Sequence, residues 1–211
     1  MSEPRELAAN VERVVDGVYH WRIRNTAIGG AISSSHAVVS DDECVFVDPV
    51  ALEAAALEML PRPTAIVLTA VCHQRAAWRL RRQFGVPVWL PIGSREAEEE
   101  PDHVYDDGDV LPGALRAVHT PGPEAAHYSL LLESDGGILF CSDLVGNDET
   151  DELHLIPPEY QDDPVEARAS ITRLLSLPFD VLCLDHGTPV VTEPKHALEI
   201  ALAEAVVHEH V

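Results

Sequence analysis

The chain has 211 residues, of which 46% are hydrophobic, which suits one large α/β domain with a sizeable core. Its 36 acidic and 14 basic residues give a formal net charge of -22, which excludes the basic patch that nucleic-acid binding needs. No stretch approaches the ~20 apolar residues of a membrane span. Residues 1–10 are charged and lack the apolar run of a secretory signal, so we expect a cytoplasmic protein.

The acidic excess comes with a near absence of lysine, because Lys195 is the only lysine in the chain. So many carboxylates repel one another and destabilise a compact state unless salt screens them. This combination favours a halophilic protein whose surface is coated with hydrated carboxylates. The alternative is an ordinary acidic protein.

The four cysteines lie far apart in the sequence, at Cys44, Cys72, Cys141 and Cys183. Three of them sit in apolar, strand-like runs. This spacing indicates free thiols in a reducing compartment, and it matches neither a disulfide framework nor a CxxC zinc site. Cys72 is the exception and reappears below.

The first half of the chain alternates between strand and helix patterns. Residues 11–24 predict a strand pair with a turn at Asp16-Gly17. Prolines end one of the helices that follow, and Gly85 ends the other. The further predicted elements are strands over 31–39, 44–47, 65–68 and 86–90, and helices over 51–60 and 73–84.

The second half begins with an acidic segment, 94–109, which we interpret as a loop. A glycine-rich hairpin turn is expected at Asp135-Gly136-Gly137, and a second loop over 147–163. The other predicted elements are strands over 114–119, 128–133, 138–141 and 181–184, and helices over 164–175 and 193–207. Two halves of strands and helices predict a four-layer αββα sandwich in a single domain over residues 1–211.

Four sequence blocks occur in an order that resembles the metallo-β-lactamase superfamily. They are VFVDP at 45–49, IVLT at 66–69 with FGVPV at 84–88, HTPG at 119–122 with FCSDL at 140–144, and LDHG at 184–187. The resemblance implies the αββα fold and a hydrolase in which metal ions held by histidines and aspartates activate water. It also places Asp48 near the site and not in it, with a supporting hydrogen-bonding role and a catalytic role both open.

Most of the ligand positions that this resemblance implies hold other residues here. With the register set on Thr69, the HxHxDH positions become Ala70, Cys72, Gln74 and Arg75, and the histidine after TPG becomes Pro123. Two positions match: Asp143 as the bridging ligand and His186 as the closing ligand. A zinc site needs about three protein ligands, so we expect an eroded, degenerate site.

Three residues could rebuild a site for zinc or another divalent metal. Cys72 stands at a histidine position and could join Asp143 and His186 in a mononuclear site, since thiolate is a good zinc ligand. His73 is one residue off the pattern, and His127 lies four residues beyond Pro123. The alternative is a buried thiol, a paired aspartate and a histidine that satisfies a turn.

Arg75 carries a separate hypothesis. It stands where a histidine for the second metal would stand, so its guanidinium could replace the missing cation and pair with Asp143. The alternative is a surface residue on a helix that continues with Arg79, Arg81 and Arg82.

Two main functions remain open from the sequence. The first is a hydrolase of an ester, thioester or similar small molecule, with Asp143, His186, His73 and Arg75 as catalytic residues. The second is a non-catalytic, metal-free descendant that binds a small molecule or a protein. Nucleophilic catalysis by Cys72 is a third reading, which requires a low thiol pKa. A homo-oligomer is compatible with either main function.

Overall fold

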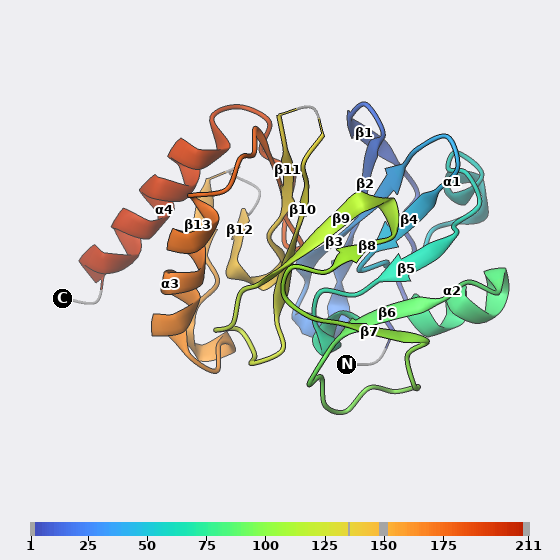
Figure 1. Ribbon diagram of the computed structural model, residues 1–211, viewed down its shortest axis with the longest axis horizontal. Coiled ribbons are helices and arrows are strands. Elements are labelled where there is room, and N and C mark those ends of the chain that lie inside the picture. The colour runs from blue at the N-terminus through green and yellow to red at the C-terminus, as the bar shows by residue number, and fades with distance from the viewer. Residues whose placement is uncertain (1–2, 135, 148–151, 209–211) are drawn as a thin grey trace.

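The computed structural model describes residues 3–134, 136–147 and 152–208. Two β-sheets stack against each other in the middle of the molecule, α1 and α2 lie outside the first sheet, and α3 and α4 lie outside the second (Figure 1). The predicted four-layer αββα sandwich is therefore confirmed.

The first sheet has seven strands in the order β1 to β7, which is also their order in the sequence. Neighbours are antiparallel from β1 to β4 and parallel from β4 to β7. The strands are β1 (Glu12–Val15), β2 (Val18–Asn25), β3 (Ala31–Val39), β4 (Cys44–Val47), β5 (Ala65–Val67), β6 (Val88–Pro91) and β7 (His103–Tyr105).

The second sheet has five strands in the order β14-β11-β10-β9-β8, and only β11 and β14 run parallel. Its strands are β8 (Val110–Leu111), β9 (Leu115–His119), β10 (Tyr128–Leu132), β11 (Ile138–Phe140) and β14 (Val181–Cys183). A separate two-stranded ribbon pairs β12 (Val145–Asn147) with β13 (Leu153–Leu155).

Four α-helices cover the sheets: α1 (Ala54–Leu57), α2 (Ala77–Phe84), α3 (Pro164–Leu174) and α4 (Pro194–His208). Short 3-10 turns lie at Thr26–Ile28, Val71–His73, Pro112–Ala114, Ser142–Leu144 and Pro158–Tyr160. Within the described ranges, no helix is both long enough and apolar enough to cross a membrane.

The core has three parts because each strand sends alternate side chains to opposite faces. In β4, Phe46 packs toward α1 and α2, while Val45 and Val47 pack between the two sheets. In the second sheet, Phe140 faces the inter-sheet core and Leu139 packs against α3 and α4. These three packed layers hold the ends of the strands in fixed positions.

The helix predicted over 51–60 is wrong in extent, because α1 covers only Ala54–Leu57. The reason is a competing backbone partner. The amide of Ala8 donates to the carbonyl of Ala51 at 2.8 Å, and the amide of Glu53 donates to the carbonyl of Ala8 at 2.9 Å. The N-terminal segment therefore takes up backbone groups that a longer helix would need.

Three other predictions need correction. The helix predicted over 73–84 starts at Ala77, because residues 71–73 form a 3-10 turn. The acidic segment 94–109 contains β7, where His103 stacks on Trp89 with ring centroids 4.2 Å apart. The predicted loop 147–163 contains β13; residues 148–151 of it, and Asp135 of the expected hairpin turn, lie outside the described residues.

Candidate metal centre

The candidate site lies at the ends of two pairs of parallel strands, one pair in each sheet. Asp48 directly follows β4, and Cys72 and His73 follow β5, its parallel neighbour. Asp143 follows β11, and the pair Asp185-His186 follows β14, which is parallel to β11. Because parallel neighbours end at the same edge of a sheet, each sheet presents its own polar side chains at one place. The stacking of the two sheets brings these two sets together.

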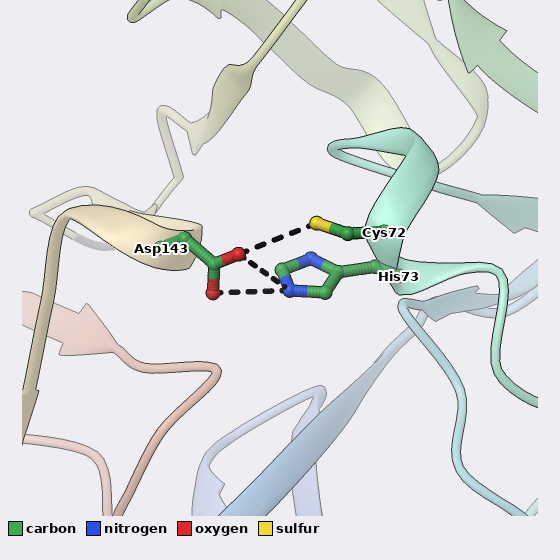
Figure 2. A group of neighbouring side chains, drawn as sticks. All are labelled: Cys72, His73 and Asp143. Carbon is green, nitrogen blue, oxygen red and sulfur yellow. Dashed lines mark hydrogen bonds and ion pairs between the residues drawn. The ribbon is translucent and has the colours of Figure 1, made fainter. Parts of the chain in front are cut away.

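Asp143 is the centre of the contacts. Its carboxylate lies 3.0 Å from Nε2 of His73 and 2.8 Å from Nε2 of His186. The thiol of Cys72 donates to Oδ2 of Asp143 at 3.4 Å, as Figure 2 shows together with the His73 contacts. One carboxylate thus meets the side chains that follow β5 in the first sheet and β14 in the second.

The other ring nitrogen of each histidine is held from behind. Nδ1 of His186 donates to the carbonyl of Ile32 at 2.7 Å, and Nδ1 of His73 lies 3.0 Å from Oδ2 of Asp185. Carbonyl and carboxylate oxygens only accept, so we assign the hydrogen to Nδ1 in both rings. Each Nε2 then faces the Asp143 carboxylate, another acceptor, and a proton or a metal cation must lie between them.

The donor atoms fit a single metal ion. The ligand atoms of Cys72, His73 and Asp143 all lie within 4.8 Å of one another. Sulfur, nitrogen and carboxylate oxygen are the donors that zinc prefers, and the other ring nitrogen of a metal-binding histidine typically lies beside a carboxylate, as Nδ1 of His73 lies beside Asp185. We call Cys72, His73 and Asp143 the donor group. His73 takes the place expected for His186, which contacts Asp143 beside this group.

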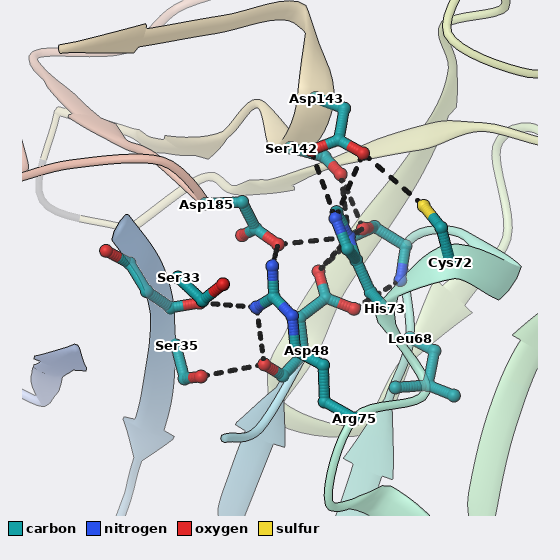
Figure 3. A network of polar contacts seen from close by, with 12 residues as sticks. Ser33, Ser35, Asp48, Leu68, Cys72, His73, Arg75, Ser142, Asp143 and Asp185 are labelled. Carbon is teal, nitrogen blue, oxygen red and sulfur yellow. Dashed lines mark hydrogen bonds and ion pairs between the residues drawn. The ribbon is translucent and has the colours of Figure 1, made fainter. Parts of the chain in front are cut away.

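The predicted pairing of Arg75 with Asp143 is wrong. Nη2 of Arg75 lies 3.3 Å from Oδ2 of Asp185, and its Nη1 donates to the carbonyls of Ser34 at 2.6 Å and Asp48 at 3.0 Å. The guanidinium therefore lies beneath the site, as Figure 3 shows. It is also not on the surface, because only 6% of Arg75 is exposed. The helix begins only at Ala77, so Arg75 is not part of it. Its side chain points toward Ser34 and Asp185.

The charges in the site perturb one another strongly. Burial alone would raise the pKa of Asp143, but His73 and the hydrogen bond from His186 hold it well below its usual range. Burial alone would lower the pKa of His73, but Asp143 and Cys72 hold it well above 6.5. Burial raises the pKa of Cys72 to about 11, so without a metal its sulfur is a thiol and a poor nucleophile.

Both carboxylate oxygens of Asp48 accept hydrogen bonds from Thr69. Its Oδ1 accepts from the amide of Thr69 at 2.9 Å, and its Oδ2 accepts from the hydroxyl of Thr69 at 2.6 Å. The same hydroxyl lies 3.1 Å from Nδ1 of His73. Burial and the neighbouring Asp185 raise the pKa of Asp48 to about 6. Asp48 thus fixes the strand end from which Cys72 and His73 project.

His127, the third candidate ligand, faces away from the metal position. Its Nδ1 lies 2.7 Å from the carbonyl of Thr120, and its Nε2 accepts from the amide of Asp143 at 3.1 Å. Burial lowers its pKa to about 4, in keeping with a neutral ring. His127 therefore orients the backbone of Asp143.

Sequence reasoning missed two acidic residues of the site. Asp185 is 2% exposed and contacts both His73 and Arg75; its signal was an acidic residue at the end of a buried strand. Glu124 accepts from the amide of Val71 at 2.8 Å and closes the turn that carries Cys72. Nothing in the sequence pattern marked Glu124, because it follows Pro123 in a loop.

The backbone at the site is strained. Among the non-glycine residues with positive φ are three at the site: Asp48 at 47°, Arg75 at 36° and Ser142 at 55°. Such conformations persist where surrounding contacts hold them, and they often occur at functional sites. Asp48 and Ser142 lie at the ends of β4 and β11, and Arg75 lies between the 3-10 turn at 71–73 and α2.

Comparison with known proteins identifies the family of this chain. A family model described as the metallo-β-lactamase superfamily matches residues 13–203. The chain therefore belongs to the metallo-β-lactamase superfamily. Among curated proteins, none matches it.

Solved structures similar to this chain share its fold at low sequence identity. The DIM-1 metallo-β-lactamase exposed to ceftazidime has a TM-score of 0.75 at 14% identity, covering 95% of this chain and 98% of that one. A metallo-β-lactamase from Pontibacter korlensis has 0.73 at 18%, covering 92% and 98%. An archaeal superfamily protein from Sulfolobus tokodaii has 0.67 at 18%, covering 82% and 80%.

Proposed function

We propose that this chain is a metal-dependent hydrolase with one zinc ion, or a similar divalent ion, held by Cys72, His73 and Asp143. The observation that carries the proposal is the convergence of these three donor atoms within 4.8 Å of one another. When bound, such an ion lowers the pKa of a water molecule and polarises a carbonyl group of the substrate. The substrate class we propose is a small ester or thioester.

The chain's own residues have distinct tasks in this proposal. Asp185 holds Nδ1 of His73, so that Nε2 points to the donor group. His127 fixes the backbone of Asp143 from behind. The His186 side chain is 24% exposed, its Nδ1 donates to Ile32, and the proton between its Nε2 and the Asp143 carboxylate can pass to a leaving group. His186 is thus the proposed general acid, on the solvent side of the carboxylate.

Metal analysis of the purified protein is the direct test. Protein prepared at high salt without chelators should contain about one zinc, manganese or iron ion per chain, or take up zinc on soaking. Cys72→Ser and Asp143→Asn should each lose most of it. Cys44→Ala is the matched control, because Cys44 is equally a free thiol but lies in the core behind α1.

Activity then separates binding from catalysis. The metal-loaded protein should hydrolyse an activated ester or thioester, and His186→Gln should lower kcat about 10²-fold or more while metal stays bound. A folded protein that takes up no metal even in excess zinc would contradict the proposal.

A second candidate function is a metal-free binding protein. It is favoured by the charge balance around Asp143, since His73 and His186 can each present a protonated nitrogen to that carboxylate. Protons on the two histidine rings would then balance the charge of Asp143 in place of a metal ion, and the site would bind a small molecule without turnover. Absence of metal together with a thermal shift from a bound small molecule would support this candidate.

A further inference from the structure

A second group of possible metal ligands lies directly beneath the donor group. It consists of Asp48, His73 and Asp185, whose ligand atoms also lie within 4.8 Å of one another. Nδ1 of His73 is 3.4 Å from Oδ2 of Asp48 and 3.0 Å from Oδ2 of Asp185. All three residues are buried, and His73 belongs to both groups through its two ring nitrogens (Figure 3).

Among the described residues, one carboxylate oxygen of this lower group, Oδ2 of Asp185, is buried without a hydrogen-bond donor. Within the described part of the chain, Oδ2 of Asp185 accepts no hydrogen bond of good geometry, although the residue is 2% exposed. Its neighbours are the ring of His73 at 3.0 Å and Nη2 of Arg75 at 3.3 Å, and both contacts are ion pairs. A buried carboxylate oxygen in this state needs a cation close by.

Arg75 supplies that cation from a fixed position. Its Nη1 donates to the carbonyls of Ser34 and Asp48, which anchors the guanidinium at the ends of β3 and β4. His73 and Arg75 hold the pKa of Asp185 below its usual range, against the effect of burial. The backbone of Arg75, at φ 36°, is bent into the conformation that this placement requires.

We infer that Asp48, His73 and Asp185 form a divalent-cation site in which the guanidinium of Arg75, held beside Asp185, replaces the metal ion as a built-in cation. The positive charge of the guanidinium beside Asp185 repels a metal ion, so the site stays closed to metal. The protein then binds at most one metal ion, in the donor group. Removing Arg75 should open the lower site to a hard or borderline divalent ion such as Mn²⁺ or Zn²⁺.

The test counts metal ions in an Arg75→Gly variant. Glycine tolerates the positive φ at this position and removes the guanidinium. At saturating Zn²⁺ or Mn²⁺, Arg75→Gly should bind one equivalent more than the wild type. Adding Asp185→Asn should remove the extra equivalent. Because the readout is the difference from the wild type, it does not depend on whether the donor group binds metal, as the proposed function requires.

Two further variants serve as controls. Arg75→Lys keeps the positive charge and should bind no extra ion. Arg79→Ala removes the same charge one turn along the chain, where Arg79 pairs with Glu3 at 2.7 Å, and it too should bind no extra ion.

The inference would be overturned by a folded Arg75→Gly protein with the same metal count as the wild type. If Arg75→Gly does not fold without metal, its refolding on addition of Zn²⁺ or Mn²⁺ supports the inference when the Arg75→Gly, Asp185→Asn double variant does not refold under the same conditions. Failure of both ions to restore folding, while Arg75→Lys folds normally, contradicts it.

Discussion

At the scale of single residues, His73 is the buried side chain that links the two groups of possible metal ligands. It is 3% exposed, and its two ring nitrogens face carboxylates on opposite sides. The sequence placed His73 near the site but one residue off the family pattern. The 3-10 turn at 71–73 carries both Cys72 and His73, and it brings them to the same Asp143 carboxylate.

The role of His127 can be tested by metal affinity. His127→Leu removes the acceptor for the amide of Asp143 and should weaken zinc binding about 10- to 100-fold, as loss of groups that orient a ligand typically does. A competition assay with a chromogenic chelator measures the change. His154→Leu, at an exposed position in β13, should leave affinity unaltered. Equal affinities in the two variants would mean that His127 does not orient Asp143.

A second pair of buried histidines predicts acid sensitivity. His20 and His36 face each other in β2 and β3, with ring centroids 5.2 Å apart. Burial lowers the pKa of His20 to about 4 and of His36 to about 3. The unfolded chain takes up these protons below about pH 6.5, whereas the folded chain does not until near pH 4. Stability from this pair is therefore present above pH 6.5 and is lost as the pH falls toward 4.

Replacing His36 tests this assignment. In His36→Leu, the decline of Tm between pH 7 and pH 4.5 should be shallower, since each such histidine contributes up to about 1.4 kcal/mol per pH unit. Thermal unfolding followed by circular dichroism gives the slope. His196→Gln, at an exposed position on α4, should retain the wild-type slope. An unchanged slope in His36→Leu would assign the acid loss to other groups.

At the scale of elements, local patterns predicted the strands well and the site loops poorly. The strands at Ala31–Val39 and Cys44–Val47 match their predicted limits, because apolar runs bounded by polar turns depend on nearby residues only. The 3-10 turn before α2, and β7, depend on partners far along the chain. The same cause hid Asp185 and Glu124, whose functions exist only through contacts between the two sheets.

The contact between the loop after β9 and α3 provides an element-scale prediction. Gly122 has φ 137°, and a Cβ there would collide with the backbone of Ala167 in α3. Gly122→Ala should therefore destabilise the fold by about 3 kcal/mol, as overpacking with backbone strain does. Gly29→Ala is the matched control, since Gly29 also has positive φ, 72°, but open space around it. Its cost should be about 1 kcal/mol.

Urea unfolding of both glycine variants measures these differences. A loss for Gly122→Ala no larger than that for Gly29→Ala would mean that α3 shifts to make room. That outcome would also leave Asp143 free to move, because its 3-10 turn packs against α3.

At the scale of the whole molecule, the composition gave the net charge, and the order of predicted strands and helices indicated the four layers of the fold. The resemblance supplied the family and two site positions, Asp143 and His186, which the structure brings into contact at 2.8 Å. The resemblance could not show which carboxylate pairs with Arg75. The pairing depends on which buried carboxylate lacks a hydrogen-bond donor in the folded protein, and no local sequence pattern shows this.

The net charge of -22 predicts a strong dependence of stability on salt. Raising KCl from 0.1 M to 1 M shortens the Debye length from about 10 Å to about 3 Å and screens the repulsion between surface carboxylates. Tm should rise by several degrees over this range. Sucrose of matched osmolality is the control, since it leaves the charges unscreened. An equal rise in sucrose, or no rise in KCl, would contradict adaptation to high salt.

The site also has a consequence for how the chain folds. Several of its contacts join residues that are far apart in the sequence, from 43 positions for Asp143 with His186 to 154 for Ile32 with His186. Closing such long loops is slow, so proteins dominated by distant contacts acquire them late. Until the two halves dock, Cys72 has no carboxylate beside it and its sulfur is open to alkylating reagents. The time at which Cys72 stops reacting during refolding therefore dates the docking of the two halves.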